Sequence, residues 1–203
     1  RVTAFLEKTE DPPTDQINAG CYVFRREVIE SIPEGRPVSV ERETFPGLLA
    51  SGARVSGHVD VAYWRDMGTP MDLVRGSADL VRGVAPSAAL PGPTGESLIL
   101  EGARIDRTAR VAGGTTVGRN VTIGKGARVE GSMLFDGAVV GDNARVLHAV
   151  VGAGARVEES ALVSETVVGD RAVIGPHCEL RHGMRIWPDV VLPPHGVRFS
   201  ADV

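Results

Sequence analysis

The chain has 203 residues, with 22 basic and 26 acidic side chains well mixed along it and a net charge of −4. It contains no basic run, so the composition argues against nucleic acid or an anionic membrane surface as a partner. Aromatic residues make up 4% of the chain, whereas it contains 25 glycines. This balance favours many short strands joined by tight turns over a large aromatic core.

The two cysteines, Cys21 and Cys178, lie far apart in the sequence. We therefore expect no disulfide framework, a packed core thiol at Cys21, and a reducing cytoplasm as the compartment. No apolar stretch approaches the roughly 18 residues that a membrane-spanning helix needs, so we expect no membrane segment. The chain begins without Met and reads there like the interior of a strand, not like a signal peptide.

Residues 1–85 predict a mixture of strands and helices. Strands are expected over about residues 2–6, 17–24 and 57–63, and a short helix over 26–32. Ser39 is a candidate N-cap, with the acidic residues Glu41 and Glu43 favourable in the first turn that follows. Pro46 lies inside this run and is expected to bend or split the helix.

Thr69 and Pro70 open a further helix, with Thr69 as the N-cap, Pro70 at the first position and Asp72 at the third. Its apolar residues fall on one face at helical spacing: Leu73, Val74, Leu80, Val81 and Val84. Proline, glycine, serine and threonine then become frequent, which predicts a linker over 86–97 between a domain at 1–85 and a domain at 98–203.

Large or branched aliphatic residues recur with a period of six in the second domain. They are Ile105, Val111, Val117, Ile123, Val129, Val140, Val146, Val151, Val157, Val168, Ile174, Leu180 and Ile186. A small residue stands two places before most of them, and glycine often follows, where we expect it to supply a corner with positive φ. A period of six suits a short strand followed by a sharp corner. Three such sides close a triangular coil of about 18 residues.

The hexapeptide pattern resembles that of left-handed parallel β-helices, and the handedness follows from this resemblance, not from the spacing. The predicted fold is therefore an α/β segment followed by an all-β left-handed parallel β-helix, and the family resemblance described below implies that the α/β segment is the C-terminal half of a Rossmann-like domain. An 85-residue mixture of strands and helices with few large apolar groups makes a poor independent domain. We therefore expect the first segment to be half of a larger one.

Four motifs occur in order ahead of the repeat: residues 5–8 (FLEK), 17–24 (INAGCYVF), 39–46 (SVERETFP) and 63–70 (YWRDMGTP). Their order and spacing resemble those of the sugar-phosphate nucleotidylyltransferases, most of all the mannose-1-phosphate guanylyltransferase branch. The resemblance covers essentially the whole chain. It implies that a sugar-1-phosphate, here mannose-1-phosphate, attacks the α-phosphate of an NTP, here GTP, and that pyrophosphate leaves. Glucose-1-phosphate with another NTP is the alternative pair.

The resemblance also implies roles for the motif residues in binding the sugar phosphate. Glu7 would accept hydrogen bonds from sugar hydroxyls, and Lys8 would contact the phosphate with its mobile ammonium group. Asn18, Ala19 and Gly20 would line the sugar pocket, since a glycine lets a ligand approach the backbone closely.

By the same resemblance, Asp66 would bind Mg²⁺, a hard cation that prefers carboxylate oxygens. The Gly-rich basic loop that holds the NTP phosphates in this family has no counterpart before residue 90. We therefore expect no catalytic residue within these 203 residues and no transferase activity from them alone.

Two other classes of function stay open. Hexapeptide β-helices also occur in acyltransferases with a histidine base, and His148, His177 and His182 lie in the repeat, where exposed corners are the expected place for them. The protein could also be a non-catalytic regulatory homologue, against which the intact motifs argue. The flat sides and end coils of the β-helix predict a homo-oligomer.

Overall fold

The computed structural model describes residues 1–5, 10–11, 13–90 and 92–196. The chain forms two compact units, Arg1–Trp64 and Arg65–Val203, and each is described by itself. This division falls ahead of the helix that begins after Thr69, whereas the sequence places the domain boundary near residue 85. The helix therefore belongs to the same compact unit as the β-helix.

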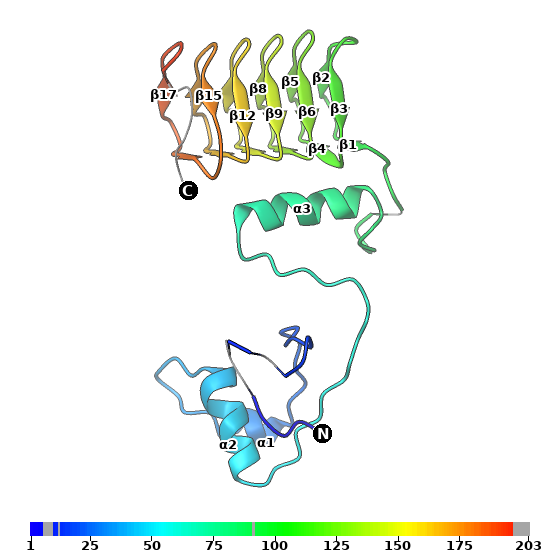
Figure 1. Ribbon diagram of the computed structural model, residues 1–203, viewed down its shortest axis with the longest axis vertical. Helices are drawn as coiled ribbons and strands as arrows, with labels where there is room; N and C mark the ends of the chain where they lie inside the picture. The colour runs from blue at the N-terminus through cyan, green and yellow to red at the C-terminus, as the bar shows by residue number, and fades with distance from the viewer. Residues whose placement is uncertain (6–9, 12, 91, 197–203) are drawn as a thin grey trace. The chain divides into compact units, whose positions relative to one another are not determined.

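The first unit is organised around three short helical segments (Figure 1). These are α1 (Arg26–Glu30), the π-helical turn η1 (Val40–Thr44) and α2 (Phe45–Ala50). As expected, the Ser39 hydroxyl caps the run by accepting a hydrogen bond from the backbone N–H of Arg42 at 3.1 Å. Pro46 lies in the first turn of α2, and the run changes there from a π-helical turn to an α-helix without an interruption, since Thr44 and Phe45 both have helical backbone angles.

The strands expected in the first unit are not formed in its described part. Residues 17–24 and 57–63 are irregular, and one backbone hydrogen bond links Val2 N–H to Val55 C=O at 2.9 Å. A strand is defined by a hydrogen-bonded neighbour, and local sequence pattern alone does not supply one. The prediction for Cys21 was also wrong, because its side chain is exposed.

Helix α3 (Pro70–Val81) begins with the reciprocal cap expected from the sequence. The Asp72 N–H donates to the Thr69 hydroxyl at 3.2 Å, and the Thr69 N–H donates to the Asp72 carboxylate at 3.1 Å. Its buried residues include Val74 and Val81, which are 2% and 1% exposed, whereas Leu73 is 42% exposed. Within the described residues, no helix is long and apolar enough to span a membrane.

The rest of the second unit is a parallel β-helix whose coils stack along one axis (Figure 1), as the hexapeptide pattern predicts. The first sheet contains β1 (Ser97–Ile99), β4 (Thr115–Val117), β7 (Met133–Leu134), β10 (Val150–Val151), β13 (Val167–Val168) and β16 (Arg185–Ile186). The second contains β2 (Arg104–Ile105), β5 (Thr122–Ile123), β8 (Val139–Val140), β11 (Arg156–Val157), β14 (Val173–Ile174) and β17 (Val191–Leu192). The third contains β3 (Arg110–Ala112), β6 (Arg128–Glu130), β9 (Arg145–Leu147), β12 (Leu162–Ser164) and β15 (Glu179–Leu180).

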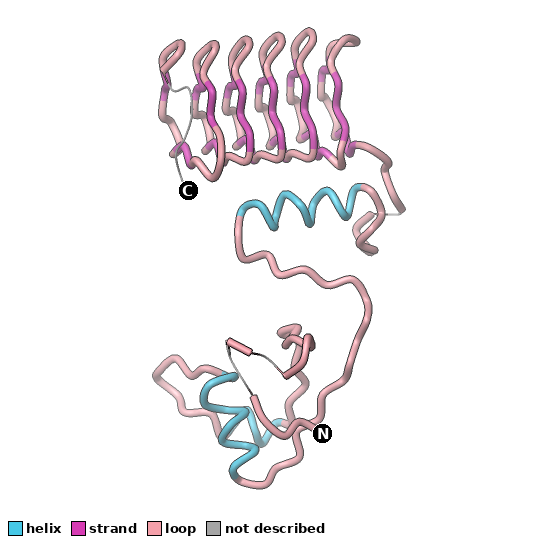
Figure 2. The backbone as a smooth tube through the Cα atoms, in the orientation of Figure 1, coloured by secondary structure: helices cyan, strands magenta, loops and turns pink. Residues whose placement is uncertain are grey.

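The strands are aligned in rows and joined by tight corners, as Figure 2 shows. In the first sheet, Ser97 pairs with Thr115, 18 residues further on, whereas Met133 pairs with Val150, 17 residues further on. The shorter coils contain one step of five in place of six. The two gaps in the predicted series are filled by Leu134 and Val163, which are 2% and 0% exposed. The predicted inward aliphatics thus stack in one continuous core.

The glycines that follow the aliphatics do not supply positive φ, which corrects the sequence expectation. The left-handed corner residue lies two places later, as at Asn120 and Gly126, with φ of 56° and 66°. Gly118 and Gly124 are needed for another reason, because a Cβ there would lie 2.8 Å and 2.4 Å from an aspartate oxygen of the next coil. Close packing between successive coils therefore selects glycine at these positions.

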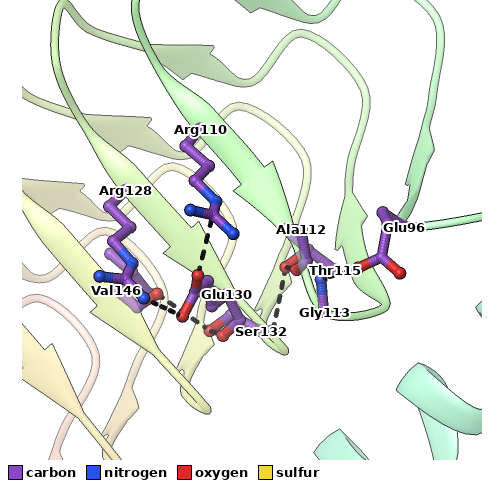
Figure 3. A network of polar contacts seen from close by, with 9 residues as sticks. All are labelled: Glu96, Arg110, Ala112, Gly113, Thr115, Arg128, Glu130, Ser132 and Val146. Atoms are coloured by element: carbon purple, nitrogen blue, oxygen red, sulfur yellow. Dashed lines mark hydrogen bonds and ion pairs between the residues drawn. The ribbon is translucent and has the colours of Figure 1, made fainter.

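Polar groups inside the coils are satisfied by the backbone (Figure 3). Thr115 and Ser132 are 0% and 1% exposed, and their hydroxyls donate to the carbonyls of Ala112 and Glu130, each at 2.7 Å. On the outer face, the Glu130 carboxylate accepts from the Arg128 guanidinium at 2.7 Å, and the hydrogen bond holds the pKa of Glu130 below its ordinary value. The two hydroxyl–carbonyl bonds offset the cost of burying the Thr115 and Ser132 hydroxyls at this corner.

Candidate functional site

The structure places the predicted site residues in different parts of the chain. Asn18, Ala19 and Gly20 lie in the first unit, and Asp66 lies at the start of the second. Glu7 and Lys8 lie outside the described residues. The geometry that bears on binding is therefore that of residues 18–20 and the side chains around them.

Asn18 is at the centre of a hydrogen-bond network built from two motifs. Its amide nitrogen lies 2.7 Å from the Tyr22 hydroxyl oxygen and 2.6 Å from Oε1 of Glu41. The Tyr22 hydroxyl also donates to the same Glu41 oxygen at 3.2 Å. The network therefore links the motif at 17–24 to the motif at 39–46.

The loop at residues 18–20 is a compact turn. The Gly20 N–H donates to Oδ1 of Asn18 at 3.1 Å, and Gly20 has φ of +73°, which favours glycine. The Trp64 indole N–H donates to the Ala19 carbonyl at 3.2 Å, so a residue of the fourth motif fixes this loop. Among the described residues, no atom lies within 4 Å of where a Gly20 Cβ would be, so these residues leave the space on that side of the loop open.

Aromatic side chains hold the first three motifs together. Phe45 is 6% exposed, and its ring stacks on Phe5 with centroids 4.5 Å apart. The Tyr22 ring meets Phe45 edge-on at 5.1 Å, and Phe24 stacks on Phe45 at 5.6 Å. Such aromatic pairs contribute roughly 0.5–1.5 kcal/mol beyond the area that they bury. The contact with the buried Phe45 ring thereby holds the Tyr22 hydroxyl beside Asn18.

The two glutamates of the third motif have different partners. Glu43 accepts hydrogen bonds from the Arg36 guanidinium at 2.8 Å and from the Ser39 N–H at 3.3 Å. These bonds lower the pKa of the Glu43 carboxyl and raise the pKa of Arg36. Glu43 is therefore a helix-start residue, as the sequence suggests. Glu41 was given the same interpretation, which misses its contact with Asn18.

Asp66 has an exposed carboxylate ahead of α3. Its Oδ2 would lie 3.5 Å from a Cβ built on Gly68, which is ordinary van der Waals contact, so Gly68 leaves the carboxylate uncrowded. Among the described residues, no group of three or more histidine, cysteine or acidic side chains gathers to hold a metal. One carboxylate still fits the way in which Mg²⁺ is bound in nucleotide enzymes, by one or two carboxylates together with substrate phosphates.

The histidines of the β-helix lie at its corners. His148, His177 and His182 have φ of 49°, 59° and 50°, and all three are exposed, as the sequence predicts. The His177 ring stacks on the ring of His195 in the next coil, with centroids 4.9 Å apart. These positions are corner-forming ones, so the described coils offer no specific support for the acyltransferase alternative.

Comparison with known proteins finds two family matches, which meet between residues 83 and 93 and not at the boundary between the two compact units. Residues 1–83 match the nucleotidyl transferase family, and residues 93–201 match the GMPPB C-terminal domain family. The chain is similar over its whole length to the mannose-1-phosphate guanylyltransferase of Mycobacterium tuberculosis, with 62% identity over 204 residues that cover 57% of that protein.

More distant relatives carry related names. Mannose-1-phosphate guanylyltransferase 1 of Arabidopsis thaliana is 32% identical over 72% of this chain and 40% of its own length. Mannose-1-phosphate guanyltransferase of Neurospora crassa is 31% identical over 72% of this chain and 51% of its own length. The chain thus spans about half the length of these curated relatives. It belongs to the GMPPB C-terminal domain family and carries a nucleotidyl transferase segment ahead of that domain.

Proposed function

We propose that the protein carrying this chain transfers a guanylyl group from GTP to mannose-1-phosphate, which gives GDP-mannose and pyrophosphate. The observation that carries the proposal is the 62% identity over the entire chain to a mannose-1-phosphate guanylyltransferase. The network around Asn18 supports it, because a fixed amide beside an open glycine turn suits a polyhydroxylated ligand.

The residues of this chain would bind and orient the sugar phosphate. Asn18, Ala19 and Gly20 would form one wall of the sugar pocket, with Glu7 accepting hydrogen bonds from ring hydroxyls. The Lys8 ammonium group would contact the phosphate, whose oxygen attacks the α-phosphate of GTP. Holding the two reactants in line lowers the entropic part of the barrier, which is the main contribution that positioning makes to such a transfer.

Asp66 would hold Mg²⁺ with its carboxylate, together with phosphate oxygens of the substrates. The ion, when bound, neutralises charge that develops on the phosphates during transfer. An exposed carboxylate at the start of the second unit is open to such ligands, and we expect the Asp66→Asn variant to lose most of its turnover.

We further propose a homo-oligomer in the cytoplasm. Ile99 points into the first coil, in register with the buried Val117, yet is 50% exposed within the described structure. An end coil of a second copy would bury such an apolar end. Cys21 and Cys178 are free thiols, which is in keeping with a reducing compartment.

Pyrophosphate release by the full-length protein tests the proposed reaction. GTP, mannose-1-phosphate and MgCl₂ should give turnover that chelation with EDTA abolishes. Glucose-1-phosphate and ATP or UTP, substituted one at a time, should give slower turnover. Faster turnover with another pair would reassign the substrates. Binding of mannose-1-phosphate or GDP-mannose without any turnover would support the regulatory homologue instead.

A further inference from the structure

We propose that Glu41 is a positioning residue, which fixes the Asn18 carboxamide so that its oxygen accepts a hydrogen bond from a hydroxyl of the sugar phosphate. This inference rests on the proposed function, because it concerns how the same sugar site distinguishes hydroxyl groups. Glu41 acts through Asn18 and is not itself placed against the sugar.

The donors and acceptors of Asn18 carry the first step of the argument. A carboxamide has two N–H donors and one oxygen with two lone pairs. The nitrogen of Asn18 faces Oε1 of Glu41 at 2.6 Å and the Tyr22 hydroxyl oxygen at 2.7 Å, so both donors are used. The oxygen accepts from the Gly20 N–H at 3.1 Å, and among the described residues no other donor is bonded to it, so a second lone pair is open to a ligand there.

The charge of Glu41 determines which way the amide faces. An ionised carboxylate only accepts hydrogen bonds, so it can face the NH₂ side of Asn18 and not the oxygen side. Rotation of the amide by 180° would bring the Asn18 oxygen against Glu41 and its NH₂ group against the Gly20 N–H. Both contacts would be repulsive, so the network selects one orientation.

Tyr22 extends this constraint to the core of the first unit. Its hydroxyl accepts from Asn18 and donates to Glu41 at 3.2 Å, so the three polar groups form a closed ring with consistent donors. The Tyr22 ring packs edge-on against Phe45, which is 6% exposed. The orientation of Asn18 is therefore tied to a buried aromatic side chain and not only to exposed groups.

The site should therefore prefer ligands that donate a hydrogen bond to the Asn18 oxygen. The free lone pair of Asn18 can accept from a sugar hydroxyl, whereas a fluorine at the same ring position cannot donate. The open space beside Gly20 leaves room for such a ligand. Removal of one hydrogen bond to a neutral group costs about 1.4 kcal/mol or less, so a change of up to about tenfold is expected.

Steady-state kinetics of the full-length protein test the role of Glu41, with mannose-1-phosphate and its monodeoxy-fluoro analogues as substrates. Glu41→Gln and Glu41→Ala should raise KM for mannose-1-phosphate by up to about tenfold while leaving KM for GTP within about twofold. The wild type should disfavour one fluoro analogue, and Glu41→Ala should lose most of that discrimination. Tyr22→Phe should act in the same direction and should not be additive with Glu41→Gln.

Glu43→Gln is the matched control, since Glu43 lies in the same turn but faces Arg36 and Ser39. It should lower the stability of the turn without changing either KM. Unchanged KM values and unchanged discrimination in Glu41→Gln and Glu41→Ala would overturn the role of Glu41 while leaving the proposed reaction in place. Absence of turnover in the wild type with any sugar-1-phosphate would overturn the proposed reaction, and this inference with it.

Discussion

Gly114→Ala should weaken the packing of α3 on the β-helix. Gly114 has φ of +81°, and a Cβ there would lie 2.7 Å from both Cα and Cβ of Ala78 and 2.8 Å from its carbonyl oxygen. Most of these atoms are backbone of α3, so the helix itself must move. The same substitution would weaken the hydrogen bond at 3.0 Å between the hydroxyls of Ser77 and Thr116.

The free-energy cost of Gly114→Ala has a conformational part and a packing part, and the same substitution at a second glycine measures the first part alone. A left-handed conformation costs a residue with a Cβ roughly 1–2 kcal/mol, and overpacking adds typically about 1–3 kcal/mol. Gly137 has φ of +71°, but its nearest neighbour would lie 3.9 Å from a Cβ. Gly137→Ala should therefore show the conformational part alone, whereas Gly114→Ala should show both.

Amide hydrogen exchange read residue by residue measures the difference. In Gly114→Ala, the amides of α3 should exchange about 30-fold faster than in the wild type, which corresponds to about 2 kcal/mol. The strands of the β-helix should keep most of their protection. Gly137→Ala should leave α3 protected. If both variants exposed α3 equally, or neither did, close packing of Ala78 on Gly114 would not be what holds the helix.

Three further changes test other parts of the second unit. Val157→Ala should lower the free energy of unfolding by about 2–3 kcal/mol in urea titrations, because Val157 is 0% exposed. Val139 lies on the outer face of the same sheet, so Val139→Ala should cost under about 1 kcal/mol. Thr69→Ala should cost about 1 kcal/mol and increase fraying of α3 in circular dichroism, whereas Thr69→Ser should keep the cap. Glu130 has a folded-state pKa below its ordinary 4.5, so it contributes stability above that pH and loses this contribution as the pH falls through the folded-state pKa. Glu130→Gln should remove that part of the acid dependence, at most about 1 kcal/mol because Arg128 is exposed, and identical pH profiles for the two proteins would contradict the assignment.

The β-helix could be predicted from sequence because each coil repeats one local rule. The aliphatic side chain at every sixth or fifth position points inward, and its partner one coil away obeys the same rule. The sequence could not show why Gly118 is a glycine, because the atoms that exclude a Cβ there belong to Asp136 and Leu134 of the next coil. Which atoms oppose Gly118 depends on the register between coils, and that register depends on where the steps of five fall.

The strands expected at 17–24 and 57–63 failed for a related reason. Alternation and β-branched residues indicate that a segment can be extended, but a ladder also needs a neighbouring strand in register. The cap of α3 required no such partner, because Thr69 and Asp72 lie three residues apart and satisfy each other. Predictions confined to one turn of the chain, the caps at Ser39 and Thr69, were therefore confirmed, whereas predictions of strand pairing were wrong.

The same limit separates the two glutamates of the third motif. Both are acidic residues in the first turn after Ser39, and helix-start rules treat them alike. Residues two apart on a helical turn point in different directions, so Glu43 reaches Arg36, seven residues away, while Glu41 reaches Asn18, 23 residues away. The partner of Glu41 is set by the packing of Tyr22 on Phe45, which itself spans 23 residues of sequence. A contact that depends on another long-range contact leaves no local pattern. Glu41 therefore emerged as a candidate site residue only when the side chains around Asn18 could be placed.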